Sequence, residues 1–284
     1  MRRSILEISV GVILFIASNI LAFNYNYSKF YSLLLLGIFL ILKGSFFIRN
    51  KKEFLNLKNF IKVYFAFLIL GLIADLIFGL WITKLWDYPG YNLFNYLILY
   101  FFIYPFGGFV MVYSFSLLES VFIRKPRENN VAYKHSLMTA LIVAAVGFLG
   151  FFISVFFVEI FKGFFIYSFF TLFGWGITNY IILKIKKNNL LEHIFVKSLK
   201  YLILILVAAY VQGIFHELPN LFAKEWVYQN WPFNEVTLLG IPVTVLLFGW
   251  LALVFVPYAV FEFIMLLNKV KNIKNLKHLI KEAT

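Results

Sequence analysis

One carboxyl group lies deep within an apolar stretch of this sequence. Asp75 precedes Trp86 by eleven residues, which is roughly 16 Å along a helix. An ionised side chain at the centre of a membrane-spanning helix costs about 3 kcal/mol on insertion scales, so such a residue needs a function or a partner. A carboxylic acid kept protonated by burial can transfer a proton, and Asp75 is therefore a candidate catalytic residue.

A second group of polar side chains ends a later apolar segment. Gln212, His216, Glu217 and Asn220 fall within nine residues, and Pro219 frees a backbone carbonyl one turn earlier. We predict His216 and Glu217 as further candidate catalytic residues and Gln212 and Asn220 as candidate substrate ligands. Our hypothesis is that one outward-opening polar cavity is lined by Asp75, Gln212, His216 and Glu217. The alternative is two separate sites, with His216 and Glu217 simply hydrated at the membrane interface.

Two short aromatic segments repeat after 140 residues. Lys84-Leu85-Trp86-Asp87-Tyr88 matches Lys224-Glu225-Trp226-Val227-Tyr228, and each segment follows the third apolar span of its half. This pattern predicts two parallel four-helix repeats, residues 1–130 and 131–267, with a cavity between them. Trp86, Tyr88, Trp226 and Tyr228 are then candidate substrate-binding residues. The alternative is that these rings only mark the membrane interface, where Trp and Tyr are common.

The elements that must position these residues are transmembrane helices. The chain is 62% hydrophobic and 14% charged, and its apolar runs are long enough to cross a bilayer. We expect an all-α polytopic membrane protein with about eight transmembrane helices. The predicted spans are residues 4–23, 30–48, 60–82, 93–123, 136–160, 163–183, 194–215 and 238–267, with bends at the prolines of the fourth and eighth.

Basic residues sort by side of the membrane. Alternate connections and the two ends hold 22 of the 26 Lys and Arg residues, whereas the other connections hold Lys29, Lys84, Lys162 and Lys224. Connections rich in Lys and Arg stay in the cytoplasm, so both termini are expected there, in the plasma membrane of a prokaryote. Residues 268–284 are predicted to form a basic amphipathic helix on the cytoplasmic leaflet. The net charge of +13 thus does not indicate nucleic acid.

The sequence lacks the residues that several kinds of chemistry require. The chain has no cysteine, and His216-Glu217 is not followed by the second histidine of a zinc-binding His-Glu-x-x-His motif. Glycine-rich phosphate loops and paired Asp-rich motifs for a magnesium pyrophosphate are also missing. We therefore expect neither a metal nor another cofactor. Glu119 and Glu262 lie near basic segments, and we expect them to pair with neighbouring lysines.

The aromatic and proline positions resemble those of membrane-embedded carotenoid-modifying proteins, of the lycopene-cyclase type and the carotenoid-hydratase-like type. The resemblance rests on Trp86-x-Tyr88 followed by Pro105, and on Glu217, Trp226-x-Tyr228, Leu239-Gly240-Ile241-Pro242 and Gly249-Trp250. Cyclases of this type carry a Pro-Glu-Glu motif, but Pro105 is followed here by Phe-Gly and Pro242 by Val-Thr. Their acids therefore cannot be transferred to this chain.

The resemblance implies acid-initiated chemistry on a polyisoprenoid, in which a carboxylic acid protonates an alkene and aromatic faces stabilise the cation. We thus expect membrane lipid and a hydrophobic isoprenoid ligand as partners. Two other functions stay open from the residues alone. The chain can be a small-solute or proton-coupled transporter, because parallel repeats with polar residues at mid-membrane also describe carriers. It can also be a non-catalytic membrane partner or assembly factor.

Overall fold

The computed structural model describes residues 2–123, 130–187, 189–196 and 198–269. The predicted tail helix, 268–284, lies almost entirely outside them. Three segments, η1 to η3, have the wider π-helical hydrogen bonding. In chain order the elements are α1 (Arg2–Tyr25), α2 (Tyr31–Asn50), α3 (Leu57–Gly71), η1 (Leu72–Ile82), β1 (Trp86–Asp87), α4 (Leu93–Ile98), η2 (Leu99–Ile103), α5 (Tyr104–Phe122), α6 (Asn130–Phe157), α7 (Lys162–Lys186), α8 (Leu190–Val196), α9 (Ser198–Ala223), β2 (Val227–Tyr228), β3 (Thr237–Leu238), β4 (Ile241–Pro242), η3 (Val245–Trp250) and α10 (Leu251–Lys269).

Eight helices among the described residues are long and apolar enough to cross a membrane, which confirms the predicted class. Their outer faces carry large apolar side chains, such as Ile13 at 66% exposure and Phe157 at 82%. Water would not tolerate so much contiguous apolar surface, whereas lipid tails solvate it. The chain is an all-α multi-pass membrane protein whose exposed helix faces contact lipid.

The predicted limits of the last two spans were wrong. The seventh span runs over Leu199–Ala223 rather than 194–215, because α8 is a separate short helix and α9 continues through Pro219. The eighth begins at Val245 rather than 238, because β3 and β4 form a small hairpin before it. Leu239 and Gly240 both have positive φ, 55° and 80°, as a two-residue hairpin turn requires.

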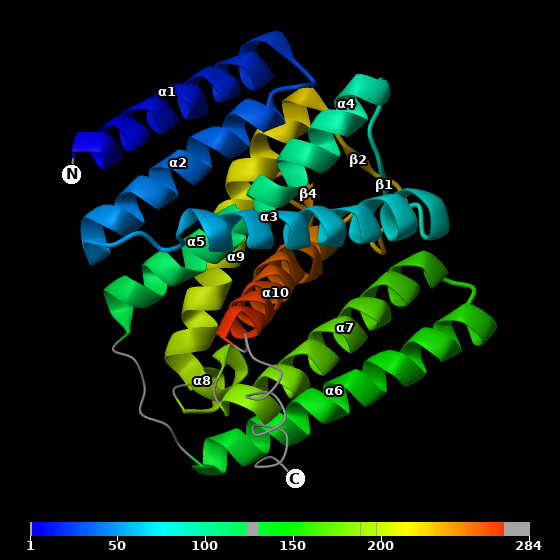
Figure 1. Cartoon of the computed structure of the whole chain (residues 1–284). Helices are drawn as coiled ribbons and strands as arrows, with labels where there is room; N and C mark the ends of the chain where they lie inside the picture. Colours follow the sequence, from blue (N-terminus) through cyan, green and yellow to red (C-terminus); the bar gives the residue numbers. More distant parts are fainter. Residues whose placement is uncertain (1, 124–129, 188, 197, 270–284) are drawn as a thin grey trace.

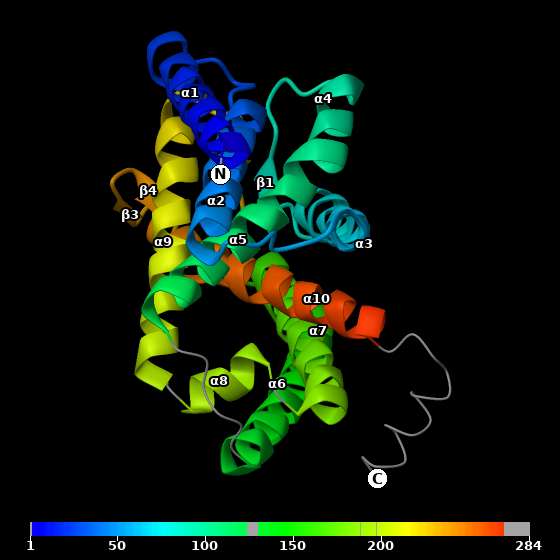
Figure 2. The same ribbon diagram turned by 60° about the vertical axis from the view of Figure 1, so that its left-hand side comes forward.

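Two helical hairpins flank a central group of helices. The α1–α2 pair and the α6–α7 pair lie on opposite sides of α3, α5, α9 and α10 (Figures 1 and 2). Helix α5 packs against α2, α3, α9 and α10, and α10 packs against α3, α5, α7 and α9. The described core is therefore built mainly around α5 and α10.

Glycines allow both hairpins to pack closely. A Cβ on Gly11 of α1 would stand 2.7 Å from the Gly37 carbonyl oxygen of α2, and one on Gly147 of α6 would stand 2.3 Å from the Phe173 nitrogen of α7. Small residues at such crossings bring backbones together and gain van der Waals contact, which drives helix association in lipid.

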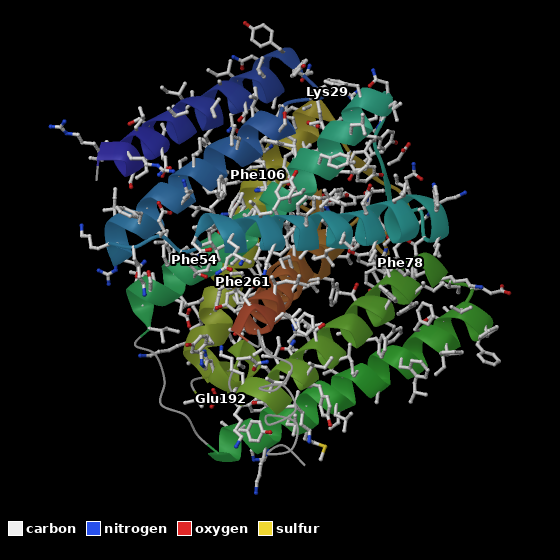
Figure 3. All side chains as sticks on the ribbon, viewed as in Figure 1. Lys29, Phe54, Phe78, Phe106, Glu192 and Phe261 are labelled. Atoms are coloured by element: carbon white, nitrogen blue, oxygen red, sulfur yellow. The ribbon has the colours of Figure 1, made fainter. Side chains whose placement is uncertain are left out.

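Connections far apart in sequence meet at one end of the bundle. The Asn230 side chain donates to the Lys84 carbonyl at 2.8 Å, and the ring of Phe161 packs on that of Phe233. Lys29 lies at this end, near the tip of α4 (Figure 3). At the opposite end, the rings of Phe54 and Phe261 stack at 5.1 Å between centroids. Figure 3 labels these two residues near each other. The four lysines set apart in the sequence belong to the first end.

Candidate active site

A cavity of about 200 Å³ lies among the central helices, towards the end that carries Lys29. Its wall combines α2, α3, η1, η2, α5, α7, α9, η3 and α10 with the connections that follow η1 and α9. Many residues of the wall are aromatic. Each of these rings offers a flat face, and each Tyr or Trp also offers one hydrogen-bonding atom. The tryptophans and tyrosines among them are Trp86, Trp226, Trp231, Trp250, Tyr31, Tyr88, Tyr91, Tyr104, Tyr167 and Tyr228.

The two matching Lys-x-Trp-x-Tyr segments form one wall of this cavity together. Strand β1 pairs with β2 in antiparallel register, with Trp86 opposite Tyr228 and Asp87 opposite Val227. Lys84 and Lys224 precede the strands and have left-handed φ values of 49° and 52°. The backbone therefore turns sharply after each of the two helices. Four predicted substrate-binding residues, Trp86, Tyr88, Trp226 and Tyr228, line the cavity.

Glu217 is the carboxyl group in the cavity wall. It extends from α9, and only 2% of the residue is exposed. Its Oε1 accepts hydrogen bonds from the Tyr228 hydroxyl at 2.5 Å and from Trp250 Nε1 at 3.0 Å. Trp226 Nε1 donates in turn to the Tyr228 hydroxyl at 3.2 Å. These donors offset the cost of removing the carboxyl from water and fix its position.

Asp75 lies one layer behind the wall. Its Oδ1 accepts from Trp86 Nε1 at 2.5 Å and from the Tyr88 hydroxyl at 3.0 Å, and that hydroxyl also lies 2.9 Å from the Tyr104 hydroxyl. Asp75 is fully buried and is not part of the cavity lining, whereas its three aromatic neighbours are.

Two glycines of the third span make room for the rings around Asp75. A Cβ on Gly79 would meet the Trp86 ring at 2.4 Å, and one on Gly71 would meet the Tyr104 ring at the same distance. Any larger residue would push these rings away. The spacing of Gly71, Asp75 and Gly79 therefore places one carboxyl between two aromatic donors.

The other predicted site residues have different positions. His216 is fully buried and its Nδ1 lies 2.6 Å from the Tyr31 hydroxyl, which lines the cavity. Gln212 donates to Ser114 Oγ on α5 at 2.8 Å. Asn220 binds the backbone N–H and carbonyl of Trp226, at 3.1 and 2.9 Å, and so fixes the start of the β2 segment. Neither Gln212 nor Asn220 lines the cavity, and burial excludes a hydrated interface position for His216 and Glu217.

Sequence reasoning missed a buried acid beside this site. Glu225 accepts from the Tyr91 hydroxyl at 2.5 Å and from the Tyr31 backbone N–H at 2.9 Å. Burial raises the pKa of Glu225 to about 7, although Tyr91, the Tyr31 N–H and Lys29 act in the opposite sense. Lys29 Nζ lies 3.8 Å from the centre of the Tyr91 ring, and burial lowers the pKa of this lysine. The available signal was the acid inside the second Lys-x-Trp-x-Tyr copy, where the first copy has Leu85.

Trp231 supplies an unused donor in the cavity wall. The residue is 6% exposed, and its Nε1 has no hydrogen-bond partner among the described residues. Buried N–H groups are nearly always bonded, so this one can serve an acceptor on a bound molecule.

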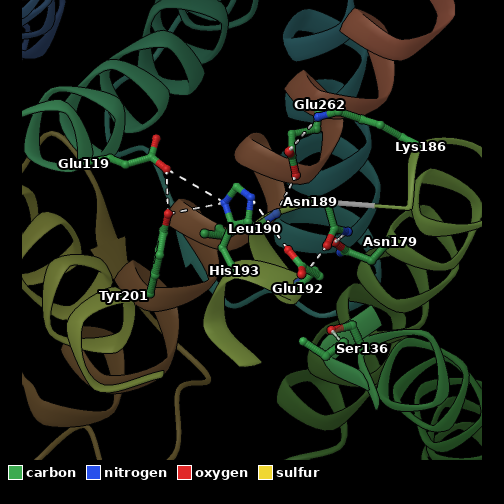
Figure 4. Close-up of polar contacts among 11 residues, drawn as sticks. Glu119, Ser136, Asn179, Lys186, Asn189, Leu190, Glu192, His193, Tyr201 and Glu262 are labelled. Atoms are coloured by element: carbon green, nitrogen blue, oxygen red, sulfur yellow. Dashed lines mark hydrogen bonds and ion pairs between the residues drawn. The ribbon is translucent and has the colours of Figure 1, made fainter. Parts of the chain in front are cut away.

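A second polar cluster joins α5, α8 and α9 at the other end of the bundle (Figure 4). The Tyr201 hydroxyl donates to Glu119 Oε1 at 3.0 Å and lies 3.3 Å from His193 Nδ1. His193 Nε2 lies 3.8 Å from the neighbouring Glu192 carboxyl. Glu119 thus joins a histidine and a tyrosine of a later segment.

The same cluster extends to α7 and α10. Glu262 lies 3.9 Å from Lys186 Nζ and accepts from the Leu190 backbone N–H at 3.2 Å. Asn189 donates to Asn179 at 2.7 Å and caps α8 through the Glu192 N–H at 3.0 Å. This lysine comes from α7 and not from the segment that follows Glu262, so charge pairing here holds separate helices together.

No group of three or more His, Asp or Glu side chains among the described residues is placed to hold a metal ion. Comparison with protein-family models, curated proteins and solved structures finds no match for this chain.

Proposed function

We propose that the chain is a membrane enzyme that modifies a hydrophobic lipid of the isoprenoid class by acid-initiated chemistry. One observation carries the proposal: a carboxyl group, Glu217, lies in the wall of an aromatic cavity and is held by hydrogen bonds from Tyr228 and Trp250. A carboxylic acid is a strong enough proton donor for an electron-rich alkene when it is positioned against it.

The proposed step begins with protonated Glu217. The alkene π electrons form a new C–H bond with the acid proton, the O–H electrons remain on the carboxylate, and the second alkene carbon becomes a cation. The cation either loses a proton from a neighbouring carbon to the carboxylate, or is first attacked by another alkene of the same chain. The products are an isomerised or a cyclised isoprenoid, and the acid is restored without a co-reactant.

The aromatic wall supports the charged intermediate. Indole and phenol faces attract cations by about 0.5–2 kcal/mol each, more when water is excluded. The faces available in the cavity include those of Trp86, Trp226, Trp231 and Trp250. Tyr228 and Trp250 also stabilise the carboxylate that remains after proton transfer.

Asp75 is proposed as a positioning residue. It binds Trp86 and Tyr88 from behind, so both rings keep one orientation towards the cavity. His216 has a similar role for Tyr31. This assignment differs from a shared catalytic role for Asp75 and Glu217, because Glu217 alone of the two lines the cavity.

The lysine distribution supports one arrangement in the membrane. We propose that the end with Lys29, Lys84, Lys162 and Lys224 faces outward and that both termini are cytoplasmic, in the plasma membrane of a prokaryote. We also propose that the halves 1–130 and 131–267 descend from a duplicated four-helix unit. The paired Lys-x-Trp-x-Tyr segments support this, as do the two glycine-packed hairpins.

The test is deuterium incorporation. Protein in lipid nanodiscs is incubated in D₂O with lycopene or geranylgeraniol, and the recovered isoprenoid is analysed by mass spectrometry. The wild type should add one deuterium per turnover, and Glu217→Gln should add none, because the amide lacks the acidic proton. Equal incorporation by both proteins would refute the proposal. Lipid extracted from the purified protein should contain an isoprenoid.

A transporter is the second candidate function, and one observation favours it. The π-helical segments η1 and η3 flank the cavity region, and interrupted helices line the binding sites of many carriers. Proteoliposomes with an imposed pH gradient should then show solute uptake that Glu217→Gln abolishes. Uptake in the absence of any deuterium incorporation would favour the carrier.

A further inference from the structure

A second cavity of about 190 Å³ adjoins the first on the side of α7. It lies between η1, α7 and α10, and its own lining includes Ile73, Phe78, Phe170, Trp175, Val256 and Val260. Five residues belong to the walls of both cavities: Leu70, Ala74, Tyr167, Leu253 and Pro257. The two spaces therefore adjoin each other along these five side chains.

The lining of the second cavity is apolar. Its polar side chains are Thr171, Thr178 and the two rings of Tyr167 and Trp175. The Thr178 hydroxyl is already used, because it donates to the Gly174 carbonyl at 2.7 Å. No carboxyl, amide or cationic side chain belongs to this lining. Such a wall suits hydrocarbon and offers little to a polar head group.

Glycines keep both spaces open. A Cβ built on Gly174 in the second cavity, or on Gly107 in the first, would meet no atom within 4 Å. Interiors are normally packed without such gaps, because an unfilled space forfeits van der Waals contacts. At both positions a larger side chain would enter empty volume rather than a neighbouring atom.

The volumes also point to joint use. Ligand pockets commonly measure about 300–1,000 Å³. Either cavity alone is smaller, at about 200 and 190 Å³, and the two together reach this range.

We propose that the second cavity is the chain subsite of the same ligand, whose reacting end lies at Glu217 in the first. The inference rests on the proposed function and names the ligand more closely: a lipid with one extended hydrocarbon chain that passes Tyr167 and Leu253 and ends between α7 and α10. Short molecules fill the first cavity only, and chain length is selected by the second.

Binding is measured by quenching of tryptophan fluorescence in nanodiscs, because Trp175 lines the second cavity and four tryptophans line the first. The probes are geraniol, with ten carbons, and geranylgeraniol, with twenty. The wild type should bind geranylgeraniol about tenfold more tightly than geraniol. Gly174→Leu should remove most of this preference and leave geraniol binding unchanged, whereas Gly107→Leu should weaken both. Ile177→Phe adds similar bulk on the exposed side of α7 and should change neither.

Ala252→Leu fills the same cavity from α10, so the expectation does not depend on one variant. Equal affinity for the two probes in the wild type would overturn the chain subsite, as would geranylgeraniol binding that both filling variants leave unchanged. A parallel pair, 1-decanol and 1-eicosanol, separates unbranched alkyl chains from isoprenoid chains: the pair of alcohols that binds more tightly identifies the type of chain. Glu217→Gln should keep the wild-type length preference. Loss of deuterium transfer with that preference intact would separate the two proposals.

Discussion

Two carboxyl groups in this molecule have nearly the same partners but different relations to the central cavity. Asp75 accepts from Trp86 and Tyr88, and Glu217 accepts from Tyr228, to which Trp226 donates. Both acids are buried about two turns before the end of the third span of their half, and their aromatic partners face each other in one β ribbon. Only Glu217 reaches the cavity wall, where it gains Trp250 from the last span.

The difference arises from the local helix. Asp75 belongs to the π-helical segment η1, and Gly71 and Gly79 let Tyr104 and Trp86 close over it. Glu217 belongs to a regular α-helix, and the residue one turn before it, Gly213, lies against the Trp250 ring. The same residue types thus produce an enclosed acid in one half and an acid in the cavity wall in the other.

The largest expected effect separates the two acids directly. Glu217→Gln should lower turnover of the proposed isoprenoid substrate by at least about a hundredfold, because general acid catalysis contributes about 10²–10⁴. Asp75→Asn keeps an oxygen acceptor for Trp86 and Tyr88, and we expect it to retain more than a tenth of wild-type turnover. Both rates are measured at saturating substrate in nanodiscs. A lower rate for Asp75→Asn than for Glu217→Gln would contradict the assignment of Glu217, rather than Asp75, as the proton donor.

Glu225 marks the next difference between the halves, because the first copy has a buried Leu85 at this position. The folded-state pKa of Glu225, about 7, lies above its ordinary value of 4.5. The folded state therefore holds this proton more tightly than the unfolded chain. The stabilising effect of the protonated Glu225 is complete below pH 4.5 and is lost as the pH rises through 7. This amounts to about 3 kcal/mol over the interval.

Thermal unfolding in nanodiscs at pH 5 and pH 8 measures this effect. The wild type should unfold at a lower temperature at pH 8, and Glu225→Gln should lose much of the difference. Glu235→Gln, an exposed acid on the same connection, serves as the control and should keep it. An unchanged pH dependence in Glu225→Gln would show that the acid is hydrated in the native protein.

The ribbon strands are also anchored in different ways. Strand β1 follows a backbone bond from the Leu85 N–H to the Gly79 carbonyl at 2.9 Å, whereas the β2 segment depends on the Asn220 side chain. Asn220→Ala removes two buried hydrogen bonds and should lower the free energy of unfolding by about 2 kcal/mol. Chemical denaturation measures this free energy. Asn230→Ala is the control, because its side-chain hydrogen bond is exposed. A loss no larger than that of the control would contradict the proposed anchor.

The sequence predicted the elements well because lipid imposes them. Apolar run length determines a span, and the prolines inside α9 and α10 do not end these helices. The predicted cavity was harder, since side-chain direction depends on π-helical turns and on packing that no periodicity records. Asp75 was found by the cost of a carboxyl group within a span, and Glu217 by the group of polar residues that ends the seventh apolar segment. Glu225 was missed because an acid in a connection carries no such cost until the fold buries it, and Gln212 was included because polarity alone does not reveal which neighbour a side chain meets.

The smallest expected effect concerns the two tyrosines that bind the acids. Tyr228→Phe removes a donor to the carboxyl in the cavity wall and should slow turnover about tenfold, since one hydrogen bond to a charged group is worth about 1.5 kcal/mol or more. Tyr88→Phe removes a donor to the enclosed Asp75, which keeps Trp86, and should change turnover less than twofold. Steady-state rates with geranylgeraniol distinguish the two. If Tyr88→Phe slows the reaction as much as Tyr228→Phe, Asp75 and Glu217 act together on the ligand, and the two halves contribute equally to one site.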